Sequence, residues 1–266
     1  MQIKRLLFQI YSRLFARKFF YSFNKALFLL GLRGLGIYPY VTGEEHLILN
    51  LLPRIINNPE PVLFDVGANI GRYSLMLRKS FPKGRIYCFE PDPVNFDILK
   101  KIETPNINLF NHALGDNESI LKFYVMTDKD KRNCSTYYKE VITEVHKGSF
   151  IELDIEVKTL DKIAELKNIE YIDFLKIDTE GSEFNILKGA KKLLENRSIG
   201  LIQFEFNAMN VISKVFFRDI RNFLENYDFY RLLPKGLIKI EENYLYSELF
   251  AFQNVLAVEK SKNLSF

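Results

Sequence analysis

The chain has 266 residues, of which 47% are hydrophobic and 26% charged, with a formal net charge of +4. This length suits one α/β domain with additions, and the composition excludes a wholly disordered chain. Cys88 and Cys134 have no metal or redox spacing, and three scattered histidines predict no zinc site, so we expect free thiols in a reducing compartment.

The positive charge is concentrated at the start of the chain. Residues 1–43 contain no Asp or Glu, so the rest of the chain is slightly acidic; the basic residues of this segment are Lys4, Arg5, Arg13, Arg17, Lys18, Lys25 and Arg33. Apolar residues at spacings of three and four predict one or two amphipathic helices over residues 3–30. One alternative places them on an anionic membrane surface, and the other packs their apolar face on the enzyme as a lid or dimer element.

Neither a signal peptide nor a spanning helix is predicted, because no stretch of the sequence approaches ~20 consecutive apolar residues. We therefore expect a cytoplasmic protein, with peripheral contact to the inner face of the membrane through residues 1–30 as an alternative. A further helix is predicted over residues 44–56, and Asn57, Asn58 and two prolines close it. The predicted division is an arm and cap over 1–58, a core domain over 59–260 and a tail over 261–266.

The core domain begins with a stretch typical of cofactor binding. An apolar run from Val62 leads into Asp65, Gly67 and Gly71, which predicts a buried strand and a glycine turn that opens a helix. Glycine lets the backbone pass close to a ligand, and the helix start offers free N–H groups. A second predicted strand ends on Glu90, about 20 residues beyond the glycines, where a carboxylate can bind ribose hydroxyls. An ordinary strand-to-helix turn is the alternative.

The residue before the first glycine indicates which cofactor binds. Asp65 would repel the pyrophosphate of a dinucleotide, and the third glycine of a dinucleotide motif is missing. A carboxylate at this point can instead match the positive sulfonium of S-adenosylmethionine. The sequence therefore favours a methyl donor, with a nicotinamide-dependent oxidoreductase as an alternative.

Beyond this stretch, residues 107–110 predict a third strand, whose end places residues 111–115 near the adenine; His112 could equally be a surface histidine. Residues 116–158 break the alternation of strands and helices and predict an antiparallel insertion with a loop that reaches over the site. A helix is predicted over 160–166 with Thr159 at its start.

A second informative stretch follows. The predicted strand 174–177 ends in Asp178 and Glu180, two carboxylates placed for chemistry at a strand's carboxyl end, and the next strand, 200–206, carries Glu205. Lys176 would need a buried partner such as Asp65. The alternatives are an ion pair with Lys176 for Asp178 and helix capping for Glu180. The three carboxylates could also hold Mg²⁺, which we do not adopt. A helix over 216–227 and strands over 229–233 and 248–258 complete the chain.

Several motifs in this order resemble the FkbM family of S-adenosylmethionine-dependent methyltransferases. They are Asp-Val-Gly-Ala-Asn-Ile-Gly at 65–71, Phe-Glu-Pro at 89–91, Ala-Leu-Gly at 113–115, Thr-Leu-Asp at 159–161 and the stretch 174–190. The resemblance covers about residues 44–258. It implies a class I Rossmann-like α/β fold, here a seven-stranded, mostly parallel sheet with an antiparallel insertion and an N-terminal helical arm. It also implies O-methylation, often of sugars or polyketide-type compounds. Asn133-Cys134-Ser135-Thr136 departs from the run of small hydroxyl residues that the family leads us to expect.

Together these arguments predict a donor site and an acceptor site. The expected donor-binding residues are Asp65, Gly67, Ala68, Asn69, Gly71, Tyr73, Glu90, Pro91, His112 and Ala113. Asp178, Glu180 and Glu205 are expected to face the acceptor, which we predict to be a small molecule or glycan; the slightly acidic core argues against nucleic acid. A homo-oligomer is an open alternative, as is a membrane-surface scaffold whose Rossmann-like domain has lost catalysis.

Overall fold

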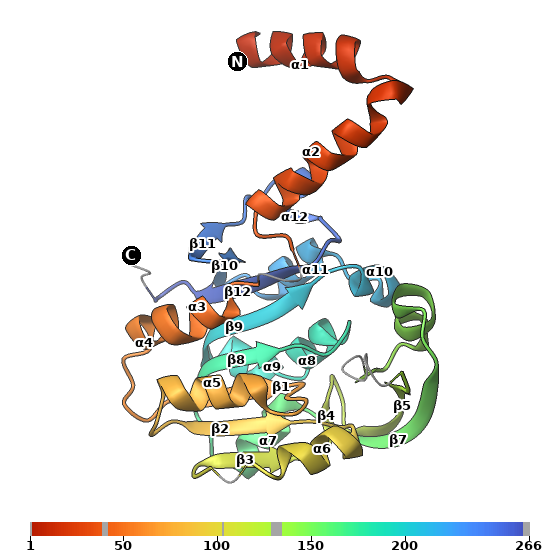
Figure 1. Cartoon of the computed structure of the whole chain (residues 1–266). Helices are drawn as coiled ribbons and strands as arrows, with labels where there is room; N and C mark the ends of the chain where they lie inside the picture. Colours follow the sequence, from red (N-terminus) through yellow and green to blue (C-terminus); the bar gives the residue numbers. More distant parts are fainter. Residues whose placement is uncertain (1, 39–41, 103, 129–134, 263–266) are drawn as a thin grey trace.

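The computed structural model describes residues 2–38, 42–102, 104–128 and 135–262 (Figure 1). Asn133 and Cys134, for which the sequence made predictions, lie outside these ranges.

One twisted sheet forms the centre of the domain, with helices on both faces (Figure 1). Its strand order is β11-β10-β12-β9-β8-β1-β2-β3, parallel from β9 to β3 and antiparallel from β9 to β11. The strands are β1 (Val62–Val66), β2 (Arg85–Phe89), β3 (Ile107–Phe110), β8 (Ile172–Ile177), β9 (Ile199–Phe206), β10 (Tyr227–Leu233), β11 (Gly236–Lys239) and β12 (Gln253–Glu259). The order reverses between β1 and β8, which is where open α/β sheets bind their ligands.

The sheet has eight strands, so the predicted number of seven was wrong. The additional strand is β11, which pairs with β10 in a tight hairpin joined by Pro234 and Lys235. Two boundaries also differ from the prediction. Helix α11 (Phe217–Phe223) ends earlier than predicted, and β12 begins at Gln253 and not at residue 248. A short helix, α12 (Tyr244–Ser247), precedes it and was not predicted.

Side chains of successive strand residues point to opposite faces, and each face has its own core. Leu63 and Phe174 pack with the π-helical turn (Leu47–Leu51) that follows α3 (Glu44–His46), and with α4 (Leu52–Ile55), α5 (Arg72–Ser80) and α6 (Pro93–Leu99). Phe64 and Leu175 pack with α7 (Leu160–Leu166), α8 (Glu183–Lys188), α9 (Lys191–Glu195) and α11 on the other face. The cap helix of residues 44–55 therefore shares a core with the domain, and the proposed division at residue 58 stays a prediction.

The insertion forms a second sheet in the order β4-β7-β5-β6. Its strands are β4 (Ala113–Leu114), β5 (Ser119–Met126), β6 (Ser135–Thr136) and β7 (Phe150–Lys158), with a π-helical turn over Val141–His146. β5 and β7 pair antiparallel along their lengths, which confirms the predicted antiparallel insertion. The pairing of β4 with β7 is parallel and was not predicted.

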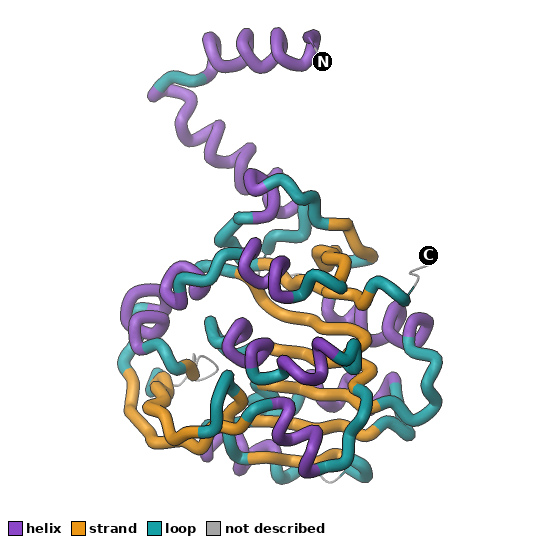
Figure 2. Tube along the Cα trace, turned by 180° about the vertical axis from the view of Figure 1, so that it is seen from behind, coloured by secondary structure: helices purple, strands orange, loops and turns teal. Residues whose placement is uncertain are grey.

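The N-terminal segment forms two helices, α1 (Gln2–Phe15) and α2 (Tyr21–Gly34), joined at a 3-10 turn (Lys18–Phe20). Both project away from the domain (Figures 1 and 2), and α2 has no buried residue. The alternative that this segment covers its own domain as a lid was therefore wrong. Within the described ranges, no helix has the length and apolar character needed to cross a membrane.

Candidate functional site

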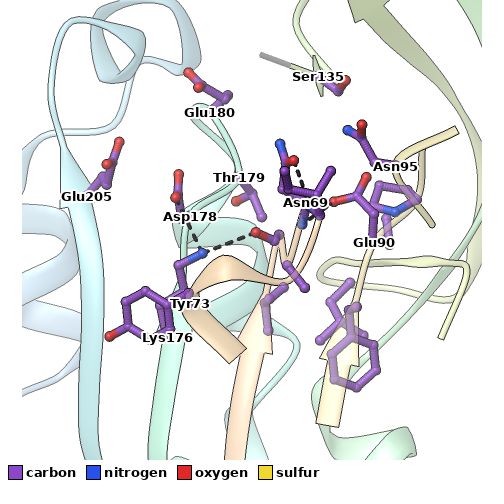
Figure 3. Close-up of a pocket in the computed structure, with 18 of the residues that line it drawn as sticks. Asn69, Tyr73, Glu90, Asn95, Ser135, Lys176, Asp178, Thr179, Glu180 and Glu205 are labelled. Carbon is purple, nitrogen blue, oxygen red and sulfur yellow. Dashed lines mark hydrogen bonds and ion pairs between the residues drawn. The ribbon is translucent and has the colours of Figure 1, made fainter. Parts of the chain in front are cut away.

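A cavity of about 690 Å³ lies at the carboxyl ends of β1, β2, β8 and β9 (Figure 3). One side is formed by the glycine turn after β1 and by the end of β2. The opposite side is formed by residues after β8 and β9, and the insertion contributes Phe123, Ser135, Tyr137 and His146. The cavity thus occupies the place where the strand order reverses.

The glycine turn is fixed between the ends of two neighbouring strands. The N–H groups of Gly67 and Ala68 both donate to the carbonyl oxygen of Phe89, at 3.0 Å. Gly67 has φ +77°, and a Cβ there would lie 1.9 Å from the carbonyl oxygen of Asp178. Any other residue would therefore push β1 away from β8. Gly67, Ala68, Asn69 and Tyr73 line the cavity, whereas Gly71 caps α5 outside the lining.

Glu90 holds the turn from the side of β2. Its carboxylate accepts the N–H of Asn69 and the N–H of Asp92, each at 2.8 Å, and the side chain is almost fully buried. Burial raises the pKa of Glu90 to about 7, although the two N–H groups oppose this. Glu90 still faces the cavity, with Pro91 and Ala113 beside it.

His112 lies outside the cavity lining. Its ring packs against Phe89 and Phe110, with ring centroids 5.5 and 5.6 Å apart, and burial lowers its pKa. His112, which the sequence analysis expected to contact the methyl donor, therefore does not line the cavity.

Asp65 lies beneath the cavity, with 0% of its surface exposed. Its carboxylate accepts the hydroxyl of Ser74 at 2.5 Å and lies 3.2 Å from the ammonium of Lys176. The expected pairing of Lys176 with Asp65 is confirmed. The negative charge of Asp65 is thus matched inside the protein, and Asp65 does not line the cavity as its predicted contact with the sulfonium would require.

Lys176 joins three parts of the site. Its ammonium lies 3.2 Å from Asp65, 3.3 Å from Asp178 and 3.1 Å from the carbonyl oxygen of Gly67, and it sits over the Tyr73 ring. Burial alone would lower its pKa, but the surrounding carboxylates outweigh burial and raise it. Lys176 therefore stays charged and ties the glycine turn to β8 (Figure 3).

Asp178 pairs with Lys176 and also lines the cavity. The ion pair considered for it in the sequence analysis therefore does not exclude a role in the site. Glu180 and Glu205 line the cavity with it. Burial, and then the charges of Asp178 and Glu180, raise the pKa of Glu205 well above its usual range. Glu205 therefore holds a proton more readily than an exposed glutamate does, and in its protonated form it can donate a hydrogen bond.

The capping role that was considered for Glu180 is performed by Glu183. The carboxylate of Glu183 accepts the N–H groups of Thr179 and Gly181, at 3.0 and 3.1 Å. Glu180 has φ +54° and its carboxylate lies 3.5 Å from Nε2 of His146, a residue of the insertion.

Glu44 and His146 are among the cavity residues that the sequence analysis did not predict. Glu44 accepts a hydrogen bond from Gln203 at 2.8 Å, and Gln203 accepts one from the Tyr73 hydroxyl. Neither residue stands in a motif, and both reach the site from elements far away in the sequence. In the described part of the chain, no group of three or more His, Cys, Asp or Glu side chains is placed to hold a metal ion.

Comparison with known proteins gives several relatives with similar, low sequence identity to this chain. The methyltransferase sdnD of Sordaria araneosa is 29% identical over 167 residues, which cover 51% of this chain and 62% of that protein. The 2-O-methyltransferase NoeI of Sinorhizobium fredii is 24% identical and covers 53% and 61%. The hexuronic acid methyltransferase AglP of Haloferax volcanii is 25% identical and covers 60% and 62%. The chain thus spans about three fifths of the length of these relatives.

Among solved structures, the FkbM methyltransferase of Methylobacillus flagellatus gives a TM-score of 0.47 at 16% identity, covering 79% of this chain and 46% of that one. The family model of the methyltransferase FkbM domain matches residues 65–230, which include the glycine turn, Glu90, Asp178, Glu180 and Glu205. Because this match covers more than half of the chain, the protein belongs to the FkbM family of S-adenosylmethionine-dependent methyltransferases.

Proposed function

We propose that the protein transfers a methyl group from S-adenosylmethionine to a hydroxyl oxygen of a sugar or glycan. Family membership supports the donor. The acceptor class rests on two relatives, one named a 2-O-methyltransferase and one a hexuronic acid methyltransferase. The observation that carries the proposal is the cavity itself, in which a glycine turn with Glu90 faces a group of carboxylates (Figure 3).

The residues on the glycine side fit the donor. The cavity volume of about 690 Å³ lies in the range of small-molecule sites. Each carboxylate oxygen of Glu90 accepts one backbone N–H, so each keeps a further acceptor position for a ribose hydroxyl. The absence of a Cβ at Gly67 keeps the turn close to β8, and Ala68, Asn69 and Pro91 complete this wall.

A bound donor supplies an electrophilic methyl group on a sulfonium. The single positive charge of Lys176 is shared by Asp65 and Asp178, so one negative charge of this group is left over, and of the two carboxylates only Asp178 lines the cavity. We propose that Asp178, together with Glu180, provides the matching negative charge. This keeps the electrostatic argument for a methyl donor but moves it from a buried carboxylate to carboxylates that line the cavity.

On the acceptor side, a sugar hydroxyl is a poor nucleophile until its proton is removed. We assign proton removal to Glu180 with His146 at its side, since a carboxylate and an imidazole together are a common proton acceptor. Glu205, whose pKa is raised by burial, would in its protonated form donate a hydrogen bond that orients the acceptor. Asp178, held by Lys176, would position the reacting groups.

The test combines donor binding with product analysis. Calorimetry should show binding of S-adenosylhomocysteine and none of NAD. Radiolabelled donor should then pass its methyl group to members of a panel of methyl glycosides and uronic acids, and mass spectrometry should place the label on oxygen. Binding of NAD in place of S-adenosylhomocysteine would support the oxidoreductase alternative. Donor binding with methylation of only nitrogen or carbon acceptors would contradict the O-methylation proposal.

A further inference from the structure

Helix α1 presents an apolar face that the described part of the domain does not cover. Ile3, Leu6, Leu7, Ile10 and Leu14 recur at spacings of three and four, which places them on one face. Their exposed fractions range from 45% at Ile10 to 76% at Ile3. A face of this kind is stable in water only when something apolar covers it.

Helix α2 is apolar around most of its circumference and equally exposed. Phe23, Leu27, Phe28, Leu29 and Leu30 are between 44% and 60% exposed. Apolar helices of this type are found in protein cores or in membranes. With 14 residues, α2 is about 21 Å long, too short for the ~30 Å hydrocarbon layer of a bilayer. The helix therefore suits a position within the membrane interface, not across it.

The two helices are held together at a fixed elbow. The Phe15 ring stacks on Tyr11 at 4.8 Å and meets Phe20 edge-on at 4.9 Å. Asn24 accepts the hydroxyl of Tyr11 at 2.5 Å and donates to the carbonyl oxygen of Phe15 at 2.9 Å. The arm is thus one shaped surface and not two independent tails (Figure 1).

The charge of the arm indicates what covers this surface. Its seven basic side chains are all exposed, and within the described ranges no ion pair joins any of them to a carboxylate. Two arms packed against each other would bring together two such sets with no acidic residue between them. An anionic lipid surface supplies both the negative charge and the apolar layer.

The folded domain adds a second apolar contact beside the base of the arm. Tyr244, Leu245 and Tyr246 of α12 are 63%, 70% and 46% exposed. Arg231 donates to the carbonyl oxygen of Tyr246, and Gly36, just after α2, lies against the next residue of β10, Leu232. Tyrosine is favoured at membrane interfaces because its ring is apolar and its hydroxyl polar.

From these observations we propose that α1 and α2, with α12 beside them, form a monotopic binding surface for anionic lipid membranes. The apolar faces enter the interface and the basic side chains contact lipid phosphates. This goes beyond methyl transfer, since none of the residues involved lines the cavity.

The experiment is flotation of the full chain with vesicles of phosphatidylcholine alone or mixed with phosphatidylglycerol. We expect binding only to the mixed vesicles, and weaker binding in high salt because salt screens the attraction. Leu6→Glu with Ile10→Glu should reduce the bound fraction about tenfold, since both charges enter the apolar face. The matched control, Gln9→Glu with Ser12→Glu, adds the same charge outside that face and should lose clearly less binding, since it weakens only the electrostatic attraction.

Failure of the wild-type chain to bind mixed vesicles, or equal loss of binding in the two double variants, would overturn the proposal. Size-exclusion chromatography with light scattering tests whether a second copy of the chain covers the apolar face instead of a membrane. A dimer that only Leu6→Glu with Ile10→Glu dissociates, without any vesicle binding, would show that the arm joins two copies of the chain. Calorimetry with S-adenosylhomocysteine on the same variants should give unchanged affinity, so a failure of this proposal is distinguishable from a failure of the proposed function.

Discussion

Lys176 is the residue that most directly links the fold to the site. It compensates Asp65, contacts Asp178 and holds the carbonyl oxygen of Gly67, so one ammonium organises both sides of the cavity floor. The sequence alone indicated that this lysine needed a partner. It also suggested Asp65 as that partner, and the parallel register, which sets Asp65 beside Lys176 on neighbouring strands, confirms it.

Replacing Lys176 by Met should destabilise the protein strongly. The variant leaves the fully buried Asp65 without its cation, which typically costs about 3–5 kcal/mol of unfolding free energy. Urea denaturation measures the loss, and Lys122→Met, which removes an exposed lysine with two surface partners, is the control and should change little. The double variant Lys176→Met with Asp65→Asn removes the unpaired charge and should recover part of the lost stability. If it is no more stable than Lys176→Met alone, Lys176 does not stabilise the protein by compensating Asp65.

The pair of His146 and Glu180 carries the proposed proton removal. Glu180→Gln and His146→Gln should each lower kcat by roughly 10²–10⁴-fold, because general base catalysis contributes that much. The affinity for S-adenosylhomocysteine should stay unchanged in both variants, and the double variant should lose little more than either single one. Glu144→Gln, an exposed change in the same helical turn as His146, is the control. Full activity in Glu180→Gln would remove this pair from the mechanism.

At the scale of elements, the start of α8 shows how a carboxylate can serve structure next to a site. Glu183 accepts the N–H groups of the turn that carries Glu180 and so fixes the turn's unusual backbone. Burial raises the pKa of Glu183 to about 7 from an ordinary value of 4.5. Between pH 4.5 and about pH 7, Glu183 therefore keeps its proton in the folded protein, whereas in the unfolded chain it has lost that proton.

This gives a pH prediction with a definite sign. The stabilisation from protonated Glu183 is complete below pH 4.5 and is lost as the pH rises through about 7. From about pH 5 to pH 7.5, the wild type should lose up to about 3 kcal/mol of unfolding free energy relative to Glu183→Gln. The Gln side chain can still accept the same N–H groups but does not ionise. Urea denaturation of both proteins at the two pH values measures the difference, and parallel pH profiles would contradict the assignment.

Elements with strong local signals were predictable from the sequence. The strand before the glycine turn and the helix begun at Thr159 follow from apolar runs, glycine and a side-chain cap, all of which act within a few residues. Strand β11 was missed because its pairing with β10 depends on a hairpin with no glycine or asparagine at its two-residue turn. The parallel pairing of β4 was missed because two residues are too few to show a pattern.

At the scale of the whole molecule, the domain and the arm differ in how far their apolar residues are buried. The domain buries its apolar residues on both faces of one sheet, whereas the arm leaves its apolar residues exposed. The arm also lies outside the region that matches the family model. Its proposed role on a membrane surface is therefore a property of this chain that family membership does not supply.

The sequence by itself determined the glycine turn, the order of most elements, and the positions of the carboxylates after β2 and β8 and near the end of β9, because these depend on local backbone preferences and on the period of apolar residues. The tertiary structure decided that Asp65 is a buried partner of Lys176, and that Glu44 and His146 enter the cavity. Those contacts join residues far apart in the chain, such as Glu44 and Gln203. They follow from sheet order and packing, and local patterns carry no information about either.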